Sequence, residues 1–271
     1  MAKTPNVPIH APFLVNAYGF FDDFTEFSSA STTGRWTSTS TGGTNAIQST
    51  GNVAGGILGL VPSGGSPAAN DAAYVSGTNA VFQLLADCPI FFEAMIQYSE
   101  ANTNYANVCA GLFSGTVTNS LQSSSGGPGS NFYGAMIYKQ GHASGSPVWS
   151  TVSSLGTTQT LNTSKNAAGV SSFVKLGLLI EPVVGGTQQS TAQTLTVSYF
   201  LNDQPLLQNV SAGSGYYPIK DTVSFTSPVT TYLYPVVGVK NGATVGGGME
   251  NVYIDYVQVW QKRAPNTNSP D

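Results

Sequence analysis

The stretch IFFEAMIQY, residues 90–98, indicates the fold class of this chain. Apolar Phe92, Ala94 and Ile96 occupy alternate positions, with polar Glu93 between two of them. Successive side chains of a β-strand point to opposite faces of a sheet. The alternation therefore predicts a strand that has one face in an apolar core and the other face towards a polar environment.

Segments of the same kind occupy most of the chain and are separated by clusters of Gly, Ser, Thr and Asn. Residues 252–261 are apolar on both faces, which predicts a strand covered on both sides. About a dozen short strands with turns between them predict an all-β protein, a two-sheet antiparallel jelly-roll sandwich. The expected strands are residues 34–38, 56–61, 72–75, 80–85, 90–98, 106–114, 132–139, 147–153, 173–182, 193–201, 232–239 and 252–261.

The composition supports this fold and reduces the range of expected binding partners. Hydrophobic residues make up 41% of the 271 residues, and charged residues only 8%, where about 25% is usual. Long helices normally carry Glu, Lys and Arg on their solvent-exposed face, so the low content of charged residues disfavours a helical protein. The net charge is −4, and the nine basic residues are spread along the chain. Without a cationic stripe, nucleic acid is not an expected partner.

The domain organisation is predicted as one jelly-roll domain, residues 18–263, between an extended N-terminal arm, residues 1–17, and a polar C-terminal tail, residues 264–271. No basic and apolar leader and no apolar run long enough to span a bilayer is recognisable. We therefore expect synthesis in a cytoplasm and no contact with a membrane.

The arm combines three prolines with large apolar residues. Such a segment either remains a disordered tail or docks on a neighbouring subunit, where its apolar side chains are buried. The candidate partner-binding residues are Val7, Ile9, Phe13, Leu14 and Val15.

Residues 90–114 are interpreted as a β-hairpin that turns near Asn102 and Thr103, with Cys88 just before its first strand and Cys109 in its second. In that hairpin Cys109 would lie opposite Ile96 and not opposite Cys88. The geometry disfavours a disulfide, so we predict two buried free thiols.

Three stretches carry a resemblance to the concanavalin A-like lectin and glucanase superfamily. FFDDFTEF with GRW (residues 20–27 and 34–36) resembles its entry strand, and residues 91–115 resemble its central hairpin. MENVYIDYVQVWQ, residues 249–261, is similar to the closing strand of laminarinase-type glucanases and laminin G-like modules. The resemblance implies the jelly-roll fold, and it leaves the function open because this fold has many functions.

Catalysis is not expected. Glucanases of this superfamily carry a Glu-x-Asp-x-x-Glu cluster on the strand that follows the hairpin, and two of its carboxyl groups act on the glycosidic bond. Residues 101–180 of this chain contain no Asp or Glu. His10 and His142 are isolated in the sequence, with no marked partner for a catalytic triad or a zinc site. We predict no catalytic residues, no cofactor and no resident metal.

Two weaker candidate sites remain. Asp22, Asp23 and Glu26 form the one local acidic cluster, which indicates either solvated acids or a structural calcium site. For calcium, the resemblance implies Asp23 together with Asp255. The adjacent pair Tyr216–Tyr217 belongs either to the fold or to a surface where aromatic rings stack on sugar.

A virion protein is favoured by the low charge, by the apolar arm and by the overall pattern of short strands. That pattern resembles jelly-roll decoration and fibre proteins of tailed bacteriophages. We predict a non-enzymatic capsid decoration (cement) protein that binds the major capsid protein or neighbouring virion subunits, as a homo-oligomer. The alternative is a carbohydrate-binding, lectin-like module, or a receptor-binding fibre or adhesin head that binds a glycan.

Overall fold

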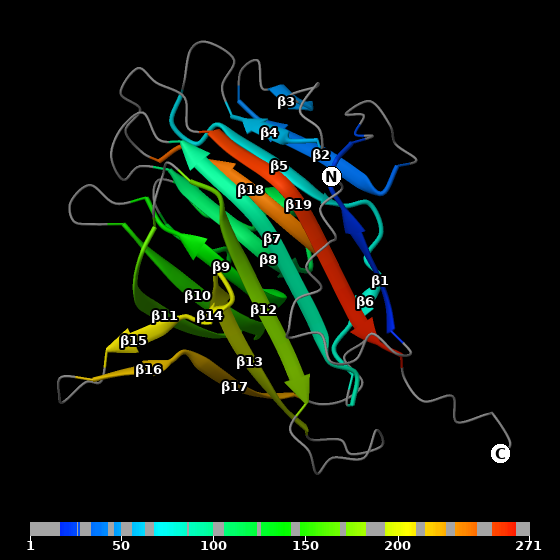
Figure 1. Ribbon diagram of the computed structural model, residues 1–271, viewed down its shortest axis with the longest axis vertical. Helices are drawn as coiled ribbons and strands as arrows, with labels where there is room; N and C mark the ends of the chain where they lie inside the picture. Colours follow the sequence, from blue (N-terminus) through cyan, green and yellow to red (C-terminus); the bar gives the residue numbers. More distant parts are fainter. Residues whose placement is uncertain are drawn as a thin grey trace, which may run out of the picture.

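Two antiparallel sheets face each other in the computed structural model of the chain (Figure 1). The structure describes residues 17–25, 27, 34–42, 46–49, 56–62, 68–85, 87–99, 106–123, 126–141, 147–168, 172–182, 193–209, 215–225, 231–242 and 251–263. Within these residues no helix is long and apolar enough to cross a membrane. The predicted tail and all of the predicted arm except Ala17 lie outside the described residues.

The first sheet has nine strands, and every recorded pairing in it is antiparallel. In spatial order they are β14 (Gln204–Pro205), β13 (Gln193–Leu201), β12 (Val174–Pro182), β7 (Ile90–Ser99), β19 (Asn251–Lys262), β4 (Leu58–Val61) and β3 (Ala46–Ser49), with β1 (Ala17–Asp22) beside β19 and β17 (Lys220–Phe225) beside β13.

The second sheet has eight strands. Their order is β11 (Thr158–Ala167), β10 (Val148–Gly156), β9 (Phe132–Lys139), β8 (Asn107–Phe113), β18 (Tyr232–Lys240), β5 (Ala72–Gly77) and β2 (Trp36–Thr41), with β6 (Phe82–Gln83) beside β18. A separate two-stranded ladder pairs β15 (Leu207–Asn209) with β16 (Tyr216–Pro218), and one short 3₁₀ helix, η1, spans Val117–Asn119.

The core lies between the two sheets and is built from alternate residues of each strand. Phe92 and Ile96 of β7 and Val108 and Leu112 of β8 are all fully buried in it. Each such side chain stabilises the fold by about 1.5–3 kcal/mol. The predicted all-β, two-sheet jelly-roll sandwich is confirmed, and the alternation that predicted it sets the inward face of these strands.

The predicted hairpin is wrong. β7 pairs with β12 and β19 in the nine-stranded sheet, whereas β8 pairs with β9 and β18 in the eight-stranded sheet. Each strand has one strongly apolar face, and the two faces bury each other across the core instead of lying side by side in one sheet. Cys88 and Cys109 are both buried and free, as predicted.

The closing strand β19 contains a β-bulge at Asp255. Ile254 lies opposite Ile96, and the next paired residue, Tyr256, lies opposite Met95. The extra residue moves the inward face from even positions before the bulge to odd positions after it. The outward-facing Gln258 is nevertheless only 5% exposed, and its Nε2 donates to Glu93 Oε1 of β7 at 2.8 Å. Its outward neighbours Tyr256 and Trp260 are half-buried, so cover of the whole strand on both sides stays a prediction.

Candidate functional site

The clearest candidate surface is built on the β15–β16 ladder. The chain enters the ladder through Leu206, whose backbone N–H donates to Tyr199 O at 2.9 Å, and leaves it through Ile219, whose N–H donates to Leu206 O at 2.7 Å. Both side chains are buried. The backbone N–H of Leu207 also donates to Asn166 Oδ1 of β11 at 3.2 Å. The ladder is therefore anchored to both sheets at its base.

Two exposed tyrosines project from this ladder. Tyr216 is 59% exposed and Tyr217 is 44% exposed, as the sequence indicated. Neighbouring residues of a strand point to opposite faces, so the structure does not bring the two rings together on one surface. Tyr216 lies opposite Asn209, and Tyr217 lies opposite Gln208.

Lys165 of β11 adds a cation to the Tyr216 face. Its Nζ atom lies 3.4 Å from the centroid of the Tyr216 ring, which is a cation–π contact. We call Tyr216, Asn209 and Lys165 the Tyr216 patch. It combines an exposed aromatic ring with an amide and an ammonium group. The tyrosines stood out in the sequence, but Lys165 carried no sequence signal because it lies on another strand.

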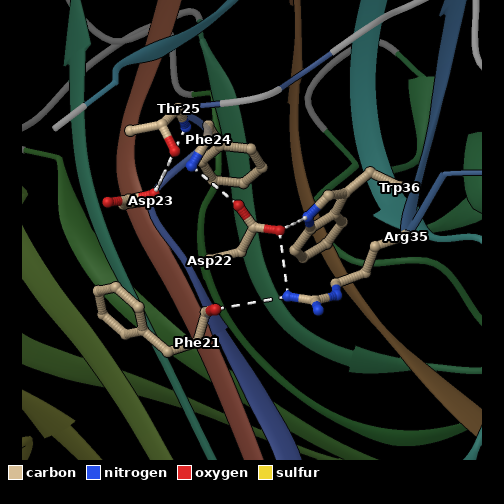
Figure 2. Close-up of polar contacts among 7 residues, drawn as sticks. All are labelled: Phe21, Asp22, Asp23, Phe24, Thr25, Arg35 and Trp36. Carbon is tan, nitrogen blue, oxygen red and sulfur yellow. Dashed lines mark hydrogen bonds and ion pairs between the residues drawn. The ribbon is translucent and has the colours of Figure 1, made fainter.

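In the acidic cluster near the end of β1, Asp22 connects this strand to the start of β2 (Figure 2). Asp22 Oδ1 accepts a hydrogen bond from the backbone N–H of Phe24 at 2.9 Å, and Asp22 Oδ2 accepts one from Trp36 Nε1 at 3.0 Å. The Arg35 guanidinium lies 3.3 Å from Asp22 Oδ2. Both oxygens of this carboxylate thus accept hydrogen bonds from the protein itself.

Within the described residues, the side-chain hydrogen bonds of Asp23 are local. Its Oδ1 accepts hydrogen bonds from the backbone N–H and the hydroxyl of Thr25, at 3.4 and 3.1 Å. Glu26 lies outside the described residues. In the part of the chain that the structure describes, no three His, Cys, Asp or Glu side chains gather into a possible metal site. The calcium interpretation of Asp23 and Asp255 therefore gains no support from this geometry.

The Asp22 contacts lead to a matched pair of predictions. Asp22→Ala is expected to lower the free energy of unfolding by about 1–3 kcal/mol, because it leaves the part-buried indole N–H of Trp36 without an acceptor. Arg35→Ala removes exposed contacts, namely the ion pair with Asp22, a hydrogen bond to Phe21 O at 3.4 Å and a cation–π contact with Phe20, and is expected to cost about 1 kcal/mol or less. Urea unfolding of both variants is the measurement. An equal loss in the two would show that the exposed contacts of Arg35 matter as much as the hydrogen bonds that Asp22 accepts from Phe24 and Trp36.

The outer face of the eight-stranded sheet is apolar. It carries a second buried cluster that includes Tyr74, Cys109, Met136 and Tyr138. Leu121, from the segment that connects β8 to β9, packs into this cluster and is 1% exposed. Burial raises the pKa of the Cys109 thiol to about 12. β8 and β9, the strands that follow β7, thus present buried apolar groups on this face.

A lysine attaches the connecting segment to this face. Lys240 Nζ donates to Leu121 O and to Ser123 Oγ, both at 3.3 Å. Burial lowers the pKa of the Lys240 ammonium group. These contacts hold residues 121 and 123 against the sheet. The five candidate partner-binding residues of the arm, Val7, Ile9, Phe13, Leu14 and Val15, lie outside the described residues.

Comparison with solved structures places the fold among lectin-like jelly rolls. No model of a protein family matches the chain, and no curated protein matches it. The chain is similar to the carbohydrate recognition domain of Emp47p, with a TM-score of 0.52 at 10% identity, over 92% of this chain and 96% of that chain. At this identity the likeness shows the fold alone.

Two further solved structures have lower TM-scores. Peanut lectin has a TM-score of 0.47 at 10% identity, over 90% of this chain and 97% of that chain. A legume lectin-like domain from Entamoeba histolytica has a TM-score of 0.44 at 10% identity, over 79% of this chain and 88% of that chain. The fold itself is a two-sheet antiparallel jelly-roll sandwich, the kind of fold that the Emp47p domain has.

Proposed function

We propose that this protein is a non-enzymatic, lectin-like module that binds a glycan at the Tyr216 patch. The observation that carries the proposal is the Tyr216 ring, which is 59% exposed on an anchored two-stranded ladder. An exposed aromatic ring presents an apolar face to the C–H groups of a sugar, and the phenol, amide and ammonium groups around it can hydrogen-bond sugar hydroxyls.

The structural likeness supports the same class of function. Emp47p and peanut lectin are described as a carbohydrate recognition domain and a lectin, and this chain has their kind of fold. A receptor-binding head of a fibre or an adhesin would use the same glycan contact. It therefore falls within the proposal.

The expectation of a capsid decoration protein in a virion has less support. It depended on the arm, whose residues lie outside the described part of the chain. It also depended on a resemblance between the overall sequence pattern and that of phage proteins. None of the structures described above adds to it. The absence of catalysis remains part of the proposal and is supported by residues 101–180, which contain no Asp or Glu to supply the carboxylate pair of a glycosidase.

The test is binding to a glycan array with and without calcium, followed by titration of the strongest glycan. Tyr216→Ala is expected to weaken that binding at least about tenfold, which corresponds to about 1.4 kcal/mol. Tyr217→Ala is the matched control, because its ring points to the opposite face of β16, and its affinity is expected to stay within about threefold of the parent, or roughly 0.7 kcal/mol. Full binding by Tyr216→Ala, or no glycan bound on the array, would contradict the proposal.

A further inference from the structure

Lys165 brings a positive charge to the Tyr216 patch, and the surrounding sequence contains no acidic residue to neutralise it. Residues 101–180, which include β11, and residues 204–220, which include the whole ladder, contain no Asp or Glu. Neither of the two ion pairs among the described residues involves Lys165. Within the part of the chain that the structure describes, the ammonium group of Lys165 therefore has no carboxylate partner.

The two acidic residues that flank the ladder in the sequence are engaged elsewhere. Asp221 is 3% exposed, and its Oδ1 accepts a hydrogen bond from Asn162 Nδ2 and its Oδ2 one from Tyr199 Oη, both at 2.7 Å. Asp203 pairs with Lys175. Neither carboxylate is thus turned towards Lys165, and the surface around Tyr216 keeps the positive charge.

The face of the ladder that carries Tyr216 also has apolar groups. Tyr216 and Pro218 are alternate residues of β16, so they point to the same face. Leu207 lies opposite Pro218, and Asn209 lies opposite Tyr216, which places both on that face as well. Tyr216 and Pro218 are exposed and Leu207 is half-buried. A sugar that stacks on Tyr216 would therefore find further apolar surface beside the ring.

The contact between Lys165 and Tyr216 leaves both groups able to bind a ligand. Lys165 is exposed, and its Nζ lies 3.4 Å from the centroid of the ring. An ammonium group has several N–H donors, so the contact with the ring does not use all of them. The Tyr216 side chain is 59% exposed with the lysine in place, so ring surface remains for stacking. A sugar on that surface would lie within reach of the ammonium group.

We infer that the glycan bound at the Tyr216 patch is acidic, with a carboxylate or a sulfate group on the sugar that stacks on Tyr216. This inference rests on the proposed function and names the class of ligand for the same site. A hydrogen bond from an ammonium group to an anionic oxygen is about twice as strong as one between neutral groups. A neutral sugar would displace water from Lys165 and give only an ordinary hydrogen bond in return.

The net charge of the whole chain makes this preference a local one. The chain carries a net charge of −4, so it has no overall attraction for polyanions. Exposed charges separated by more than about 8 Å are also largely screened at physiological ionic strength. A preference for acidic glycans therefore has to come from Lys165 itself, and one substitution should remove it.

The test is an array of paired glycans, in which each acidic glycan is printed beside its neutral analogue. One set pairs uronic acids with the corresponding hexoses, and the other pairs sulfated sugars with the unsulfated ones, so the two sets show which anionic group is preferred. The acidic member of a pair is expected to bind about three- to tenfold more tightly in about 0.05 M salt, and the difference is expected to shrink in about 0.5 M salt.

Three lysine variants show whether Lys165 causes the preference. Lys165→Gln is expected to remove most of it, whereas Lys165→Arg, which keeps the charge, is expected to retain it. Lys220→Gln is the matched control, because it removes the same charge from an exposed lysine of β17 that is not part of the patch. It is expected to leave the preference unchanged. Since both lysines are exposed, all three variants are expected to fold like the parent.

Two results would overturn the inference and leave the proposed function intact. The first is a neutral glycan that binds as tightly as its acidic analogue and is lost in Tyr216→Ala. The second is a preference for acidic glycans that Lys165→Gln does not reduce. Full binding by Tyr216→Ala, or no glycan bound in any pair, would instead contradict the proposed function, and the inference would fail with it.

Discussion

Between pH 9 and 12 the protein is expected to lose stability progressively. Burial raises the pKa of Cys109 and of Tyr18 to about 12, and it raises the pKa of Tyr74 above its ordinary value of 10.0. The unfolded chain releases these protons from its thiols and phenols near their ordinary pKa values, while the folded chain keeps them. Above about pH 9 the unfolded state therefore binds fewer protons, and the free energy of unfolding falls as the pH rises.

The size of this effect is large because the groups are fully buried. Cys109 and Tyr74 are 0% exposed, and each fully buried group contributes a loss of about 1.4 kcal/mol per pH unit between its unfolded and folded pKa values. At neutral pH these groups are protonated in both states, so they contribute no pH dependence there. Partly exposed Tyr18 adds less, because water screens its surroundings.

Urea unfolding at pH 7, 9, 10 and 11 measures this loss directly. Cys109→Ala is expected to make the pH dependence between 9 and 11 shallower by up to one proton per molecule, and Tyr74→Phe to do the same above pH 10. The Cys109 thiol of the parent is also expected to resist a thiol reagent at pH 8 until urea unfolds the protein. A free energy of unfolding that stays constant from pH 9 to 11 would contradict the burial of these groups.

The alternation in residues 90–98 was sufficient to predict the fold class, because the two-residue period of a strand is a local property of the backbone. The same period cannot show which sheet a strand joins. Residues 90–98 and 106–114 have equally apolar inward faces, and they satisfy the pattern either as a hairpin or across the core. The pairing partners of β7, at residues 174–180 and 251–261, are distant in the sequence, and for that reason the hairpin prediction was wrong.

β11 was missed for a different reason. Residues 158–167 carry polar side chains at most positions, because this strand is at the edge of its sheet and pairs with β10 alone. Its Asn162 donates a hydrogen bond to buried Asp221 at 2.7 Å, and its Lys165 completes the Tyr216 patch. Both contacts join residues more than fifty positions apart in the sequence, so the sequence could suggest the exposed tyrosines but not their neighbours.

Gly134→Ala is expected to lower the free energy of unfolding by more than about 3 kcal/mol. Gly134 lies in β9 with a φ of +132°, which side chains other than glycine rarely adopt. A Cβ atom there would lie 2.1 Å from the backbone oxygen of Leu112 in β8. β8 and β9 are both central strands, so neither can move aside freely to relieve the clash. The hydrogen bonds between the two strands must therefore break at this position.

Gly177→Ala is the matched control, because Gly177 is also in a central strand, β12. A Cβ atom at this position would meet Phe200 Cβ at 3.5 Å and Phe92 O at 3.8 Å, which are ordinary contacts. The free energy of unfolding is expected to change by no more than about 1 kcal/mol. Alanine lowers the conformational entropy of the unfolded chain, and this gain offsets the small shifts of neighbouring atoms around the new Cβ. Urea unfolding at neutral pH distinguishes the two variants. Equal losses would mean that the cost comes from replacing a strand glycine as such and not from the approach of Leu112 O, because only that approach and the positive φ set the two glycines apart.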